Sequence, residues 1–229
     1  MKSGTRVLGV AESYVGSTDD AATEPPPASA APDANDESTD RPDDTDSFEA
    51  TTAESHTAAS TPTSVLCGAV VRADRVVDGL AFETCTVGGD DATDAIASLW
   101  SSLGREDARY VLVSGIAPAW FNLVDSPRLA ADLDRPVISV SFEASDGLEP
   151  ALREHFSGAA LDARLETYRD APPRTPIEVN DERLFVRAAG CDTAEAERVV
   201  RAFTPTGGRP EPIRVARMAA RAARQFVGD

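Results

Sequence analysis

The stretch RVLGVAESYV, residues 6–15, decides the fold because an apolar strand ends abruptly in polar side chains. The apolar run, residues 6–11, has the length of one strand. Glu12, Ser13 and Tyr14 follow it directly. We therefore ask which elements surround this strand and what its polar end could bind.

Residues 17–63 cannot belong to a packed core. Their only bulky apolar side chain is Phe48, and they hold one of the two histidines, His56. Such a segment does not bury enough apolar surface to offset an ordering cost of roughly 1 to 2 kcal/mol per residue. We expect a disordered acidic insert after a first strand within residues 1–16. The rest is long enough for one domain with its own core.

The charge follows the same division. The chain carries a net charge of −17, of which residues 17–63 contribute −11. Lys2 is the only lysine, and arginine supplies the other basic groups. An acid excess with arginine in place of lysine is typical of proteins from salt-loving archaea, although a compositional bias of the genome gives the same pattern.

The cysteines and the apolar runs indicate a cytoplasmic protein. Cys67, Cys85 and Cys191 are odd in number and widely spaced, which favours buried thiols over disulfides. The longest apolar stretch, residues 110–121, is broken by Ser114 and Gly115 and is too short to span a bilayer. We therefore expect no membrane association.

Periodicity predicts the order of the elements. Beta-branched runs at residues 65–72 and 76–87 read as a hairpin, and a helix capped by Asp90 or Asp91 ends at Gly104. A second alternation of strands and helices follows at residues 109–113, 125–133, 136–142 and 148–156. A hairpin turning at Asn180 and Asp181, a helix at residues 193–202 and a last helix opened by Pro212 complete the chain.

This order predicts an α/β ribonuclease H-like fold. Three antiparallel strands followed by β-α units give a mixed sheet with helices on both faces. The core would comprise residues 1–16 and 64–156. Residues 157–229 would extend the same domain with a C-terminal β-hairpin and two helices.

The residue types of the sequence argue against many catalytic mechanisms. His155 is the only histidine outside the insert, and no G-x-S-x-G elbow is present, which argues against Ser-His-Asp and Cys-His catalysis. A P-loop would need a lysine where the sequence has none, and a zinc site would need clusters of Cys and His, which the sequence also lacks. Asp90 and Asp91 in GGDD would repel a phosphate, so we interpret them as helix caps. Carboxylate-bound Mg²⁺ remains, with ligands converging from the ends of neighbouring parallel strands.

The first and fourth strands carry a family resemblance. GVAESY, residues 9–14, resembles the first-strand motif G-V-D-x-S-Y of endonuclease V, and VLVSGIA, residues 111–117, is similar to its fourth-strand L-V-D-G. Nearly all of the chain outside the insert resembles the uncharacterised archaeal family called domain of unknown function 99 (UPF0215), a relative of endonuclease V. The stretches that carry this are KSGTRVLGVAES, LCGAVVR, VVDGLAFETCTVGGDDATDAI, VLVSGIAPAWFNLVD, RPVISVSF and PEPIRVA.

The resemblance implies a metal site that this chain has lost in part. The two aspartates of the nuclease fall on Ala11 and Ser114, which cannot bind a metal as carboxylates do. Glu83 could stand where the nuclease has a glutamate. Glu12 is adjacent to Ala11, but neighbouring residues of a strand point to opposite faces. Mg²⁺ or Mn²⁺ binding is therefore doubtful, and Glu12, Glu83 and Asp91 are the candidate ligands.

Polar and aromatic residues near the same strand ends are candidates for binding substrate. Trp120 and Phe121 could stack a base, or could pack the following helix with Asn122 or Asp125 as its cap. The full candidate set for substrate binding is Ser13, Tyr14, Ser114, Gly115, Trp120, Phe121, Asn122 and Asp125.

The last helix carries a stripe of basic residues. Arg214, Arg217, Arg221 and Arg224 recur at helical spacing and could follow a nucleic-acid backbone, or could form a solvated face. The acidic insert could compete with nucleic acid for this stripe.

We expect an endonuclease V-related protein that binds nucleic acid or a nucleotide through a degenerate metal site. An active Mg²⁺-dependent endonuclease using Glu12 and Glu83 is one alternative. A non-catalytic protein-interaction module is another.

Overall fold

The computed structural model describes residues 1–14 and 62–227. Most of the predicted acidic insert lies outside the described residues, but Thr63, which the sequence placed in it, is the first residue of a strand. The strands are β1 Arg6–Glu12, β2 Thr63–Arg72, β3 Val77–Thr86, β4 Ala108–Ser114, β5 Val137–Ser141, β6 Thr175–Val179 and β7 Glu182–Ala189. The helices are α1 Ala92–Leu103, α2 Pro118–Phe121, α3 Ser126–Leu133, α4 Glu149–His155, α5 Gly158–Asp170, α6 Thr193–Ala202 and α7 Glu211–Val227.

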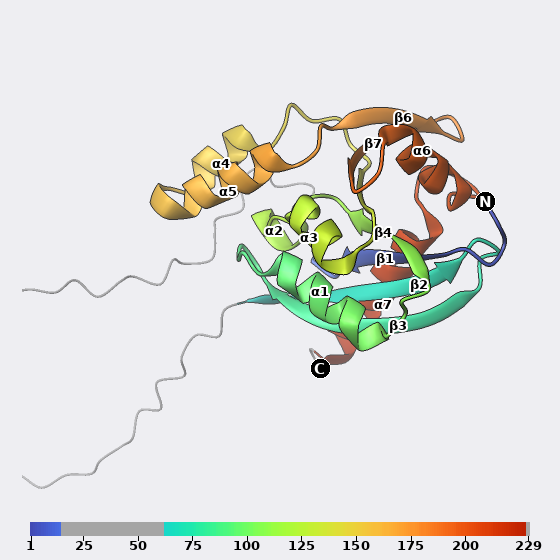
Figure 1. The fold of residues 1–229 in the computed structure, drawn as a ribbon. Coiled ribbons are helices and arrows are strands. Elements are labelled where there is room, and N and C mark those ends of the chain that lie inside the picture. Colours follow the sequence, from blue (N-terminus) through green and yellow to red (C-terminus); the bar gives the residue numbers. More distant parts are fainter. Residues whose placement is uncertain (15–61, 228–229) are drawn as a thin grey trace, which may run out of the picture. The chain divides into compact units, whose positions relative to one another are not determined.

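The seven strands form one mixed sheet in the order β3-β2-β1-β4-β5-β7-β6 (Figure 1). β1, β2 and β3 pair antiparallel, whereas β4 pairs parallel to β1 and β5 pairs parallel to β4. The predicted mixed sheet, with an antiparallel side and a parallel side, is confirmed. The C-terminal hairpin extends that sheet, because β7 pairs antiparallel with β5.

β1 and β4 are neighbours in the centre of the sheet. Val10 of β1 pairs with Val113 of β4, so Ala11 and Ser114 are the next residues of the two parallel strands. The predicted proximity of these two strand ends is therefore confirmed. We call the carboxyl ends of β1 and β4 the β1–β4 tip.

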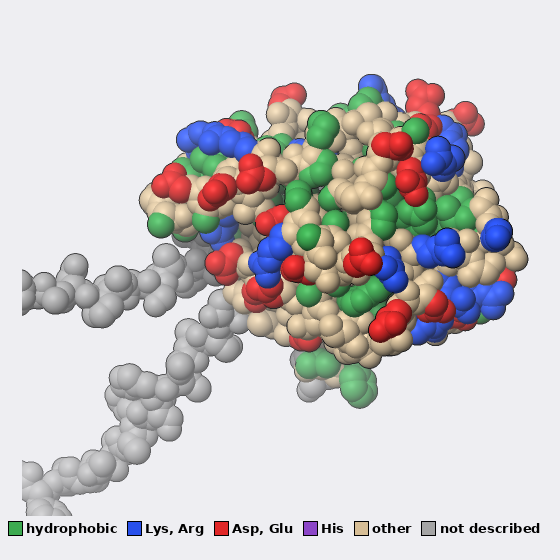
Figure 2. All heavy atoms as spheres, viewed as in Figure 1, with side chains coloured by type: hydrophobic (Ala, Val, Ile, Leu, Met, Phe, Trp, Pro, Cys, Tyr) green, Lys and Arg blue, Asp and Glu red, His purple; other side chains and the backbone are tan. Residues whose placement is uncertain are grey.

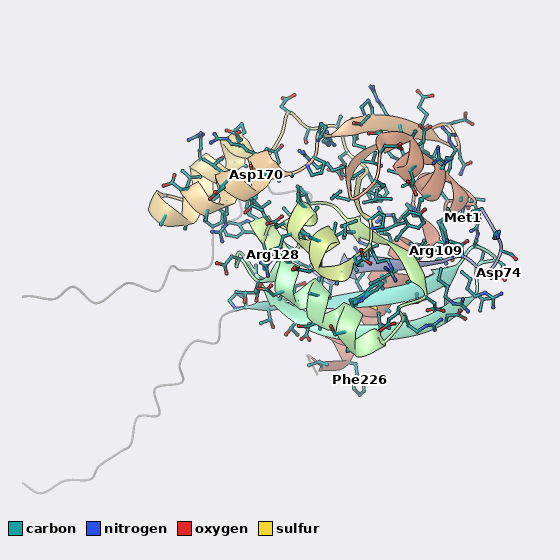
Figure 3. The ribbon with its side chains drawn as sticks, viewed as in Figure 1. Met1, Asp74, Arg109, Arg128, Asp170 and Phe226 are labelled. Carbon is teal, nitrogen blue, oxygen red and sulfur yellow. The ribbon has the colours of Figure 1, made fainter. Side chains whose placement is uncertain are left out.

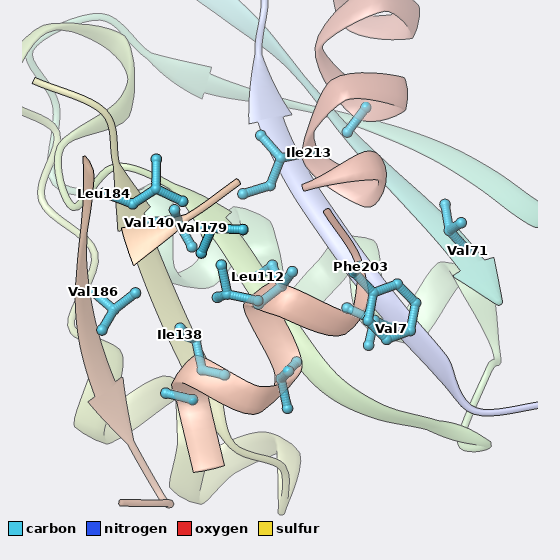
Figure 4. Packing of buried hydrophobic residues seen from close by; sticks show 14 of the residues in the cluster. Val7, Val71, Leu112, Ile138, Val140, Val179, Leu184, Val186, Phe203 and Ile213 are labelled. Atoms are coloured by element: carbon cyan, nitrogen blue, oxygen red, sulfur yellow. The ribbon is translucent and has the colours of Figure 1, made fainter. Parts of the chain in front are cut away.

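Two layers of helices cover the sheet. One apolar cluster joins β1, β4 and β5 to α6 and α7 through residues such as Val7, Leu112, Phe203 and Ile213 (Figure 4). A second cluster joins the other face to α1 and α3, with Ile96 and Leu129 at its centre. Alternation along the strands sends odd-numbered residues of β1 toward α7 and even-numbered ones toward α1.

Two glycines let the helices approach the sheet closely. A Cβ built on Gly9 of β1 would lie 2.2 Å from the carbonyl carbon of Pro212, at the start of α7. A Cβ on Gly68 of β2 would lie 2.1 Å from Cδ2 of Leu99 in α1. These two positions fix how far each helix layer stands from the sheet.

Most predicted elements occur where the sequence placed them, and two observed helices, α2 and α5, were not predicted. Asn180 and Asp181 both have positive φ, +49° and +64°, as a two-residue hairpin turn requires. Helix α5 was not predicted, because Leu165 is its only buried side chain and it shows no apolar stripe. Within residues 1–14 and 62–227, no helix has the length and apolar character needed to cross a membrane.

Candidate nucleic-acid interface

The β1–β4 tip lies at the same end of the sheet as α4 and α5. Figure 3 labels Met1 and Arg109 at the amino ends of β1 and β4, and Asp170 of α5 at the opposite end. Open α/β sheets bind their ligands at the carboxyl ends of the strands. The candidate site is therefore built from the tip, the loops that follow β4 and β5, and α7.

Ala11 and Ser13 at the tip are buried, and Tyr14 is partly buried. Ala11 is 3% exposed and belongs to the apolar cluster under α7. Ser13 is 1% exposed, and its Oγ accepts a hydrogen bond from the amide of Val65 at 3.0 Å. The amide of Tyr14 donates to Oγ of Ser64 at 3.1 Å. These contacts hold the end of β1 against β2.

Glu12 is the one carboxylate at the tip. It is partly buried, and its Oε2 is buried without a hydrogen-bond partner among the described residues. Burial raises the pKa of Glu12 to about 7, although Arg217 and Arg221 of α7 act in the opposite direction. The same glutamate contributes to the raised pKa of Cys85, which is caused mainly by burial of the thiol. The charges of two arginines, Arg217 and Arg221, thus act on the pKa of Glu12.

The other two candidate metal ligands have their own contacts. Oε1 of Glu83 accepts a hydrogen bond from the amide of Thr84 at 3.0 Å. Asp91 accepts hydrogen bonds from the amide and the hydroxyl of Thr86 and, at 2.6 Å, from Nδ2 of Asn122. Burial would raise the pKa of Asp91, but these hydrogen bonds outweigh it and hold that pKa below its usual value.

These side chains do not fit a carboxylate-bound cation. In the parts of the chain that the structure describes, no three His, Cys, Asp or Glu side chains come together as metal ligands. Mg²⁺ takes oxygen ligands in octahedral geometry, whereas β1 offers the methyl group of Ala11 on one face of the sheet and the carboxylate of Glu12 on the other. The side chains present at the tip therefore do not form the metal site that the resemblance implies.

Asn122 and Asp125 act as helix caps. Asn122 is fully buried, and its Oδ1 accepts a hydrogen bond from the amide of Ala92, the first residue of α1, at 2.9 Å. Asp125 accepts from the amide of Arg128 at 3.0 Å and caps α3, as one sequence interpretation predicted. Asp91 stands at the N-cap position of α1 without capping it by its side chain. The structure thus places Asn122 in the core.

Trp120 and Phe121 pack into an aromatic cluster. Their rings lie 5.3 Å apart, and Trp120 also stacks near His155 and Phe156 at 5.4 and 5.5 Å. Ala119 through Phe121 all have positive φ, a conformation that costs roughly 1 to 2 kcal/mol for each non-glycine residue. This turn directs the two rings toward α4, and not toward α3, the following helix of the packing interpretation.

A pocket of about 420 Å³ opens beside the tip. The loops after β4 and β5, helix α5, strand β7 and helix α7 all contribute to it. Its lining residues are Gly115, Ile116, Ala117, Ser139, Ser141, Phe142, Glu143, Ser145, Gly147, Leu148, Tyr168, Arg174, Arg187, Arg209 and Arg217. Of the predicted substrate-binding residues, only Gly115 lines it.

Two of the four arginines in this pocket are engaged by the protein. Arg174 donates to the carbonyl oxygens of Glu143 and Ser145 and lies 3.7 Å from the ring centre of Phe185. Arg187 donates to the carbonyl oxygen of Pro172 at 2.5 Å and to the hydroxyl of Tyr168 at 3.2 Å. These contacts fix the wall of the pocket.

The other two arginines are shared with an adjoining pocket of about 340 Å³ along α7. Arg209 and Arg217 line both pockets, and Arg221 lines the second. Arg209 lies 4.2 Å from the ring centre of Phe142, and its Nη1 is buried without a partner among the residues described. We call these two connected pockets the arginine cleft.

Of the six arginines that line the cleft, only Arg214 forms an ion pair within the described part of the chain. Twelve ion pairs connect the side chains of residues 1–14 and 62–227, and none of them involves Arg174, Arg187, Arg209, Arg217 or Arg221. Burial lowers the pKa of Arg209, and the like charges of Arg217 and Arg221 lower it further. Five arginines without an ion pair are thus concentrated here, although Glu143 also lines the cleft.

The predicted basic stripe of α7 divides into three parts. Arg214 is paired with Glu211 at 2.6 Å and is thereby neutralised. Arg217 and Arg221 line the cleft without an ion pair, Arg214 lines it as well, and Arg224 donates to the carbonyl oxygen of Ser13 at 3.5 Å. The sequence did not indicate Arg174, Arg187 or Arg209, because no local pattern connects them with α7.

Comparisons with known proteins identify relatives of this chain. The family model described as Endonuclease dU matches residues 49–224. A UPF0215 protein of Pyrobaculum aerophilum is 34% identical over 166 residues, covering 72% of this chain and 88% of its own length. A UPF0215 protein of Thermococcus kodakarensis is 36% identical over 160 residues, covering 69% and 80%. The resemblance to the UPF0215 family is confirmed.

Solved structures support the fold. A protein of unknown function from Archaeoglobus fulgidus matches with a TM-score of 0.67 and 22% identity, covering 96% of this chain and 98% of its own. Endonuclease V from Bacillus subtilis matches with a TM-score of 0.54 and 12% identity, covering 98% and 82%. Ciona intestinalis endonuclease V, in complex with a DNA containing an inosine, matches with a TM-score of 0.51 and 12% identity, covering 97% and 87%. The fold is thus that of endonuclease V, a ribonuclease H-like fold.

Proposed function

The chain belongs to the Endonuclease dU family, and on that premise we propose that it binds nucleic acid in the arginine cleft. The observation that carries the proposal is that the cleft gathers six arginines, five of which form no ion pair among the described residues, in a chain whose net charge is −17. Uncompensated guanidinium groups in a partly buried cleft are suited to phosphate oxygens, which they can bind through two hydrogen bonds each. Endonuclease V was solved with DNA, which supports the same class of ligand.

The proposal is tested by removing Arg209 and Arg217 together. Binding of fluorescent single-stranded DNA and RNA is measured by anisotropy at several salt concentrations. We expect Arg209→Ala/Arg217→Ala to weaken binding by roughly tenfold or more and to reduce the slope of log K against log salt by about 1 to 2. Unchanged affinity would contradict the proposal.

Arg198→Ala is the matched control. Arg198 is exposed on α6, outside the cleft, and it also forms no ion pair within the described part of the chain. The two kinds of variant therefore remove the same chemical group from different places. We expect the control to bind like the unmodified chain.

A second candidate function is cleavage of DNA that contains dU, which the description of the family favours. The residues of the tip offer no carboxylate metal cluster, so we assign no catalytic step to them. Incubating dU-containing and undamaged oligonucleotides with the protein, with and without Mn²⁺ or Mg²⁺, separates this candidate from binding alone. Products that appear only with the dU substrate would establish it.

We infer that the protein works in the cytoplasm of a salt-loving archaeon. The inference is supported by the presence of a single lysine, the acidic composition and the archaeal relatives. At such salt concentrations only direct contacts with a ligand retain their strength, because the Debye length is about 3 Å at 1 M. A partly buried cleft provides contacts of this kind.

A further inference from the structure

The free edge of β3 carries exposed apolar side chains. β3 is the last strand on one side of the sheet, and its neighbour among the described strands is β2 (Figure 1). Leu80 and Phe82 are 46% and 49% exposed. They point to the face on which α7 packs, because Leu80 pairs with Ala69 of β2, a member of the apolar cluster under α7. α7 packs on β1 and β2, and these two side chains of β3 remain accessible.

Side chains of the protein occupy both ends of this edge. A paired strand directs the backbone groups of alternate residues away from its neighbour. In β3 these are the even-numbered residues, because the amides of Thr84 and Thr86 donate to carboxylate side chains at 3.0 Å each and not to β2. At the other end, Nη1 of Arg105 donates to the carbonyl oxygen of Asp78 at 2.8 Å.

The outward amides and carbonyl oxygens of Leu80 and Phe82 lie between these ends. Within residues 1–14 and 62–227, no hydrogen bond reaches these four groups. The segment GLAF, residues 79–82, also contains no proline and no charged residue, which are common means of blocking strand addition at a sheet edge. The middle of β3 is therefore a template for one more strand.

The pattern of free backbone groups is self-complementary. Leu80 and Phe82 stand symmetrically about Ala81, so a two-fold axis at Ala81 places Leu80 of one copy opposite Phe82 of a second copy. In an antiparallel pair, such opposed residues exchange two hydrogen bonds, and the axis generates this pair twice. All four free groups are thereby paired, and the leucine and phenylalanine side chains pack across the strands on one face.

Other registers of this pairing are less favourable. A shift of one residue would turn the apolar side chains of the two copies to opposite faces. A shift of two residues brings Thr84 opposite Leu80, or Asp78 opposite Phe82. The amide of Thr84 and the carbonyl oxygen of Asp78 are already bound by side chains. The hydrogen bonds therefore select the symmetric register.

We propose that this chain forms a two-fold homodimer in which β3 of one copy pairs antiparallel with β3 of a second copy, with Ala81 at the axis. The inference uses no residue of the arginine cleft and does not depend on the proposed function. In this register Glu83 lies opposite Gly79, so like charges do not oppose each other across the strands. Four hydrogen bonds and two apolar pairs make a small interface, so the dimer is reversible and depends on protein concentration.

The charge of the chain sets the conditions of the test. A net charge of −17 on each copy opposes association at low ionic strength. We expect the dimer to strengthen between about 0.1 M and about 1 M salt, where the Debye length falls from about 10 Å to about 3 Å. Sedimentation velocity of the full chain over a range of protein concentrations measures the fraction of dimer in each salt.

The apolar pairs are tested with Leu80→Lys/Phe82→Lys. This variant places like charges opposite each other on both sides of the axis, and we expect it to weaken dimerisation by about tenfold or more. Leu80→Lys/Phe82→Glu places opposite charges in the same pairs and should dimerise more strongly than the first variant. Both side chains are exposed in the single chain, so circular dichroism and thermal denaturation should show that both variants are folded.

The register is tested with Ala81→Cys. Opposed residues that do not bond to each other have Cα atoms about 4.5 Å apart, within the range of a disulfide. We expect mild oxidation to give a covalent dimer, read on a non-reducing gel. Thr84→Cys is the matched control, because Thr84 is exposed on the same strand but would lie about six residues, or roughly 20 Å, from its counterpart. The unmodified chain reports any cross-linking through its own cysteines.

Three results would overturn the inference. One is a chain that stays monomeric in about 1 M salt at every concentration. Another is a dimer that persists unchanged in Leu80→Lys/Phe82→Lys or cross-links equally through Thr84→Cys and Ala81→Cys. The third is dimerisation that occurs only after residues 17–60 are deleted, which would show that this segment, and not a second copy, covers the edge.

Discussion

Glu12 shows how one residue can couple the stability of the fold to pH. Its carboxyl is partly buried at the end of β1, and burial raises its pKa from 4.5 to about 7. An acid with a raised pKa binds more protons in the folded state than in the unfolded state between these two values. The associated stability is fully present below about pH 4.5 and is lost as the pH rises to about 7.

The Glu12→Gln variant should remove this dependence. We expect its free energy of unfolding, relative to that of the unmodified chain, to rise between about pH 4.5 and pH 7 by roughly 2 to 3 kcal/mol in total. Urea denaturation of both proteins at four or five pH values in this range measures the difference. A difference that stays constant with pH would show that Glu12 has an ordinary pKa in the folded protein.

Asn122 joins three elements from a position with no access to solvent. It caps α1 through Ala92, donates to the carbonyl oxygen of Thr86 at 2.8 Å and donates to Asp91. Its replacement by alanine would leave buried polar groups unpaired, which costs about 1 to 3 kcal/mol for each of them.

We therefore predict that Asn122→Ala lowers the free energy of unfolding by at least about 2 kcal/mol. Chemical denaturation measures the loss. Ser101→Ala, which removes an exposed hydroxyl that donates to the carbonyl oxygen of Ala97, should change stability by less than about 0.5 kcal/mol. Similar losses in the two variants would contradict a linking role for Asn122.

At the scale of elements, the position of α7 depends on a missing side chain in β1. Pro212 lies so close to Gly9 that an added Cβ would meet its backbone at 2.2 Å. Backbone atoms cannot move aside as a flexible side chain can. Gly9→Ala must therefore push α7 away from the sheet, and with it the arginines that face the cleft.

We predict that Gly9→Ala destabilises the protein by at least about 2 kcal/mol and also weakens nucleic-acid binding. Gly4→Ala is the matched control, because a Cβ at Gly4 has no neighbour within 4 Å. Thermal denaturation and anisotropy of the two variants provide the comparison. If Gly9→Ala were as stable as Gly4→Ala, α7 would not pack on β1 as described.

The elements also show why the fold could be predicted better than the site. Helix α6 was predicted with its observed bounds, and the structure shows that the side chain of Asp192 caps it. The β1–β4 tip followed from the strand order. The cleft could not be predicted, because Arg174 precedes β6, Arg187 lies in β7 and Arg209 precedes α7. The sheet brings these three residues together in space, and no local periodicity of the sequence predicts this.

At the scale of the whole molecule, the acidic and basic groups are distributed in different ways. On the face shown in Figure 2, acidic and basic side chains are interspersed, as expected for a surface laced with ion pairs. The cleft instead gathers six arginines, of which only Arg214 forms an ion pair among the described residues. The sequence of residues 17–63 carries a net charge of −11, the larger part of the total of −17. A cationic cleft and an acidic segment in one chain attract each other at low ionic strength.

We therefore predict that deleting residues 17–60 strengthens nucleic-acid binding at low salt. The deletion leaves Thr63 and the rest of β2 in place and changes the net charge from −17 to −6.

The control keeps the length and replaces the acidic residues of that segment by asparagine and glutamine. If the acidic charge competes with the ligand, both variants bind more tightly than the unmodified chain in 0.1 M salt. The advantage disappears near 1 M, where the Debye length falls from about 10 Å to about 3 Å. Anisotropy titrations across this range decide the matter, and equal affinities of all three proteins at low salt would show that the segment does not compete for the cleft.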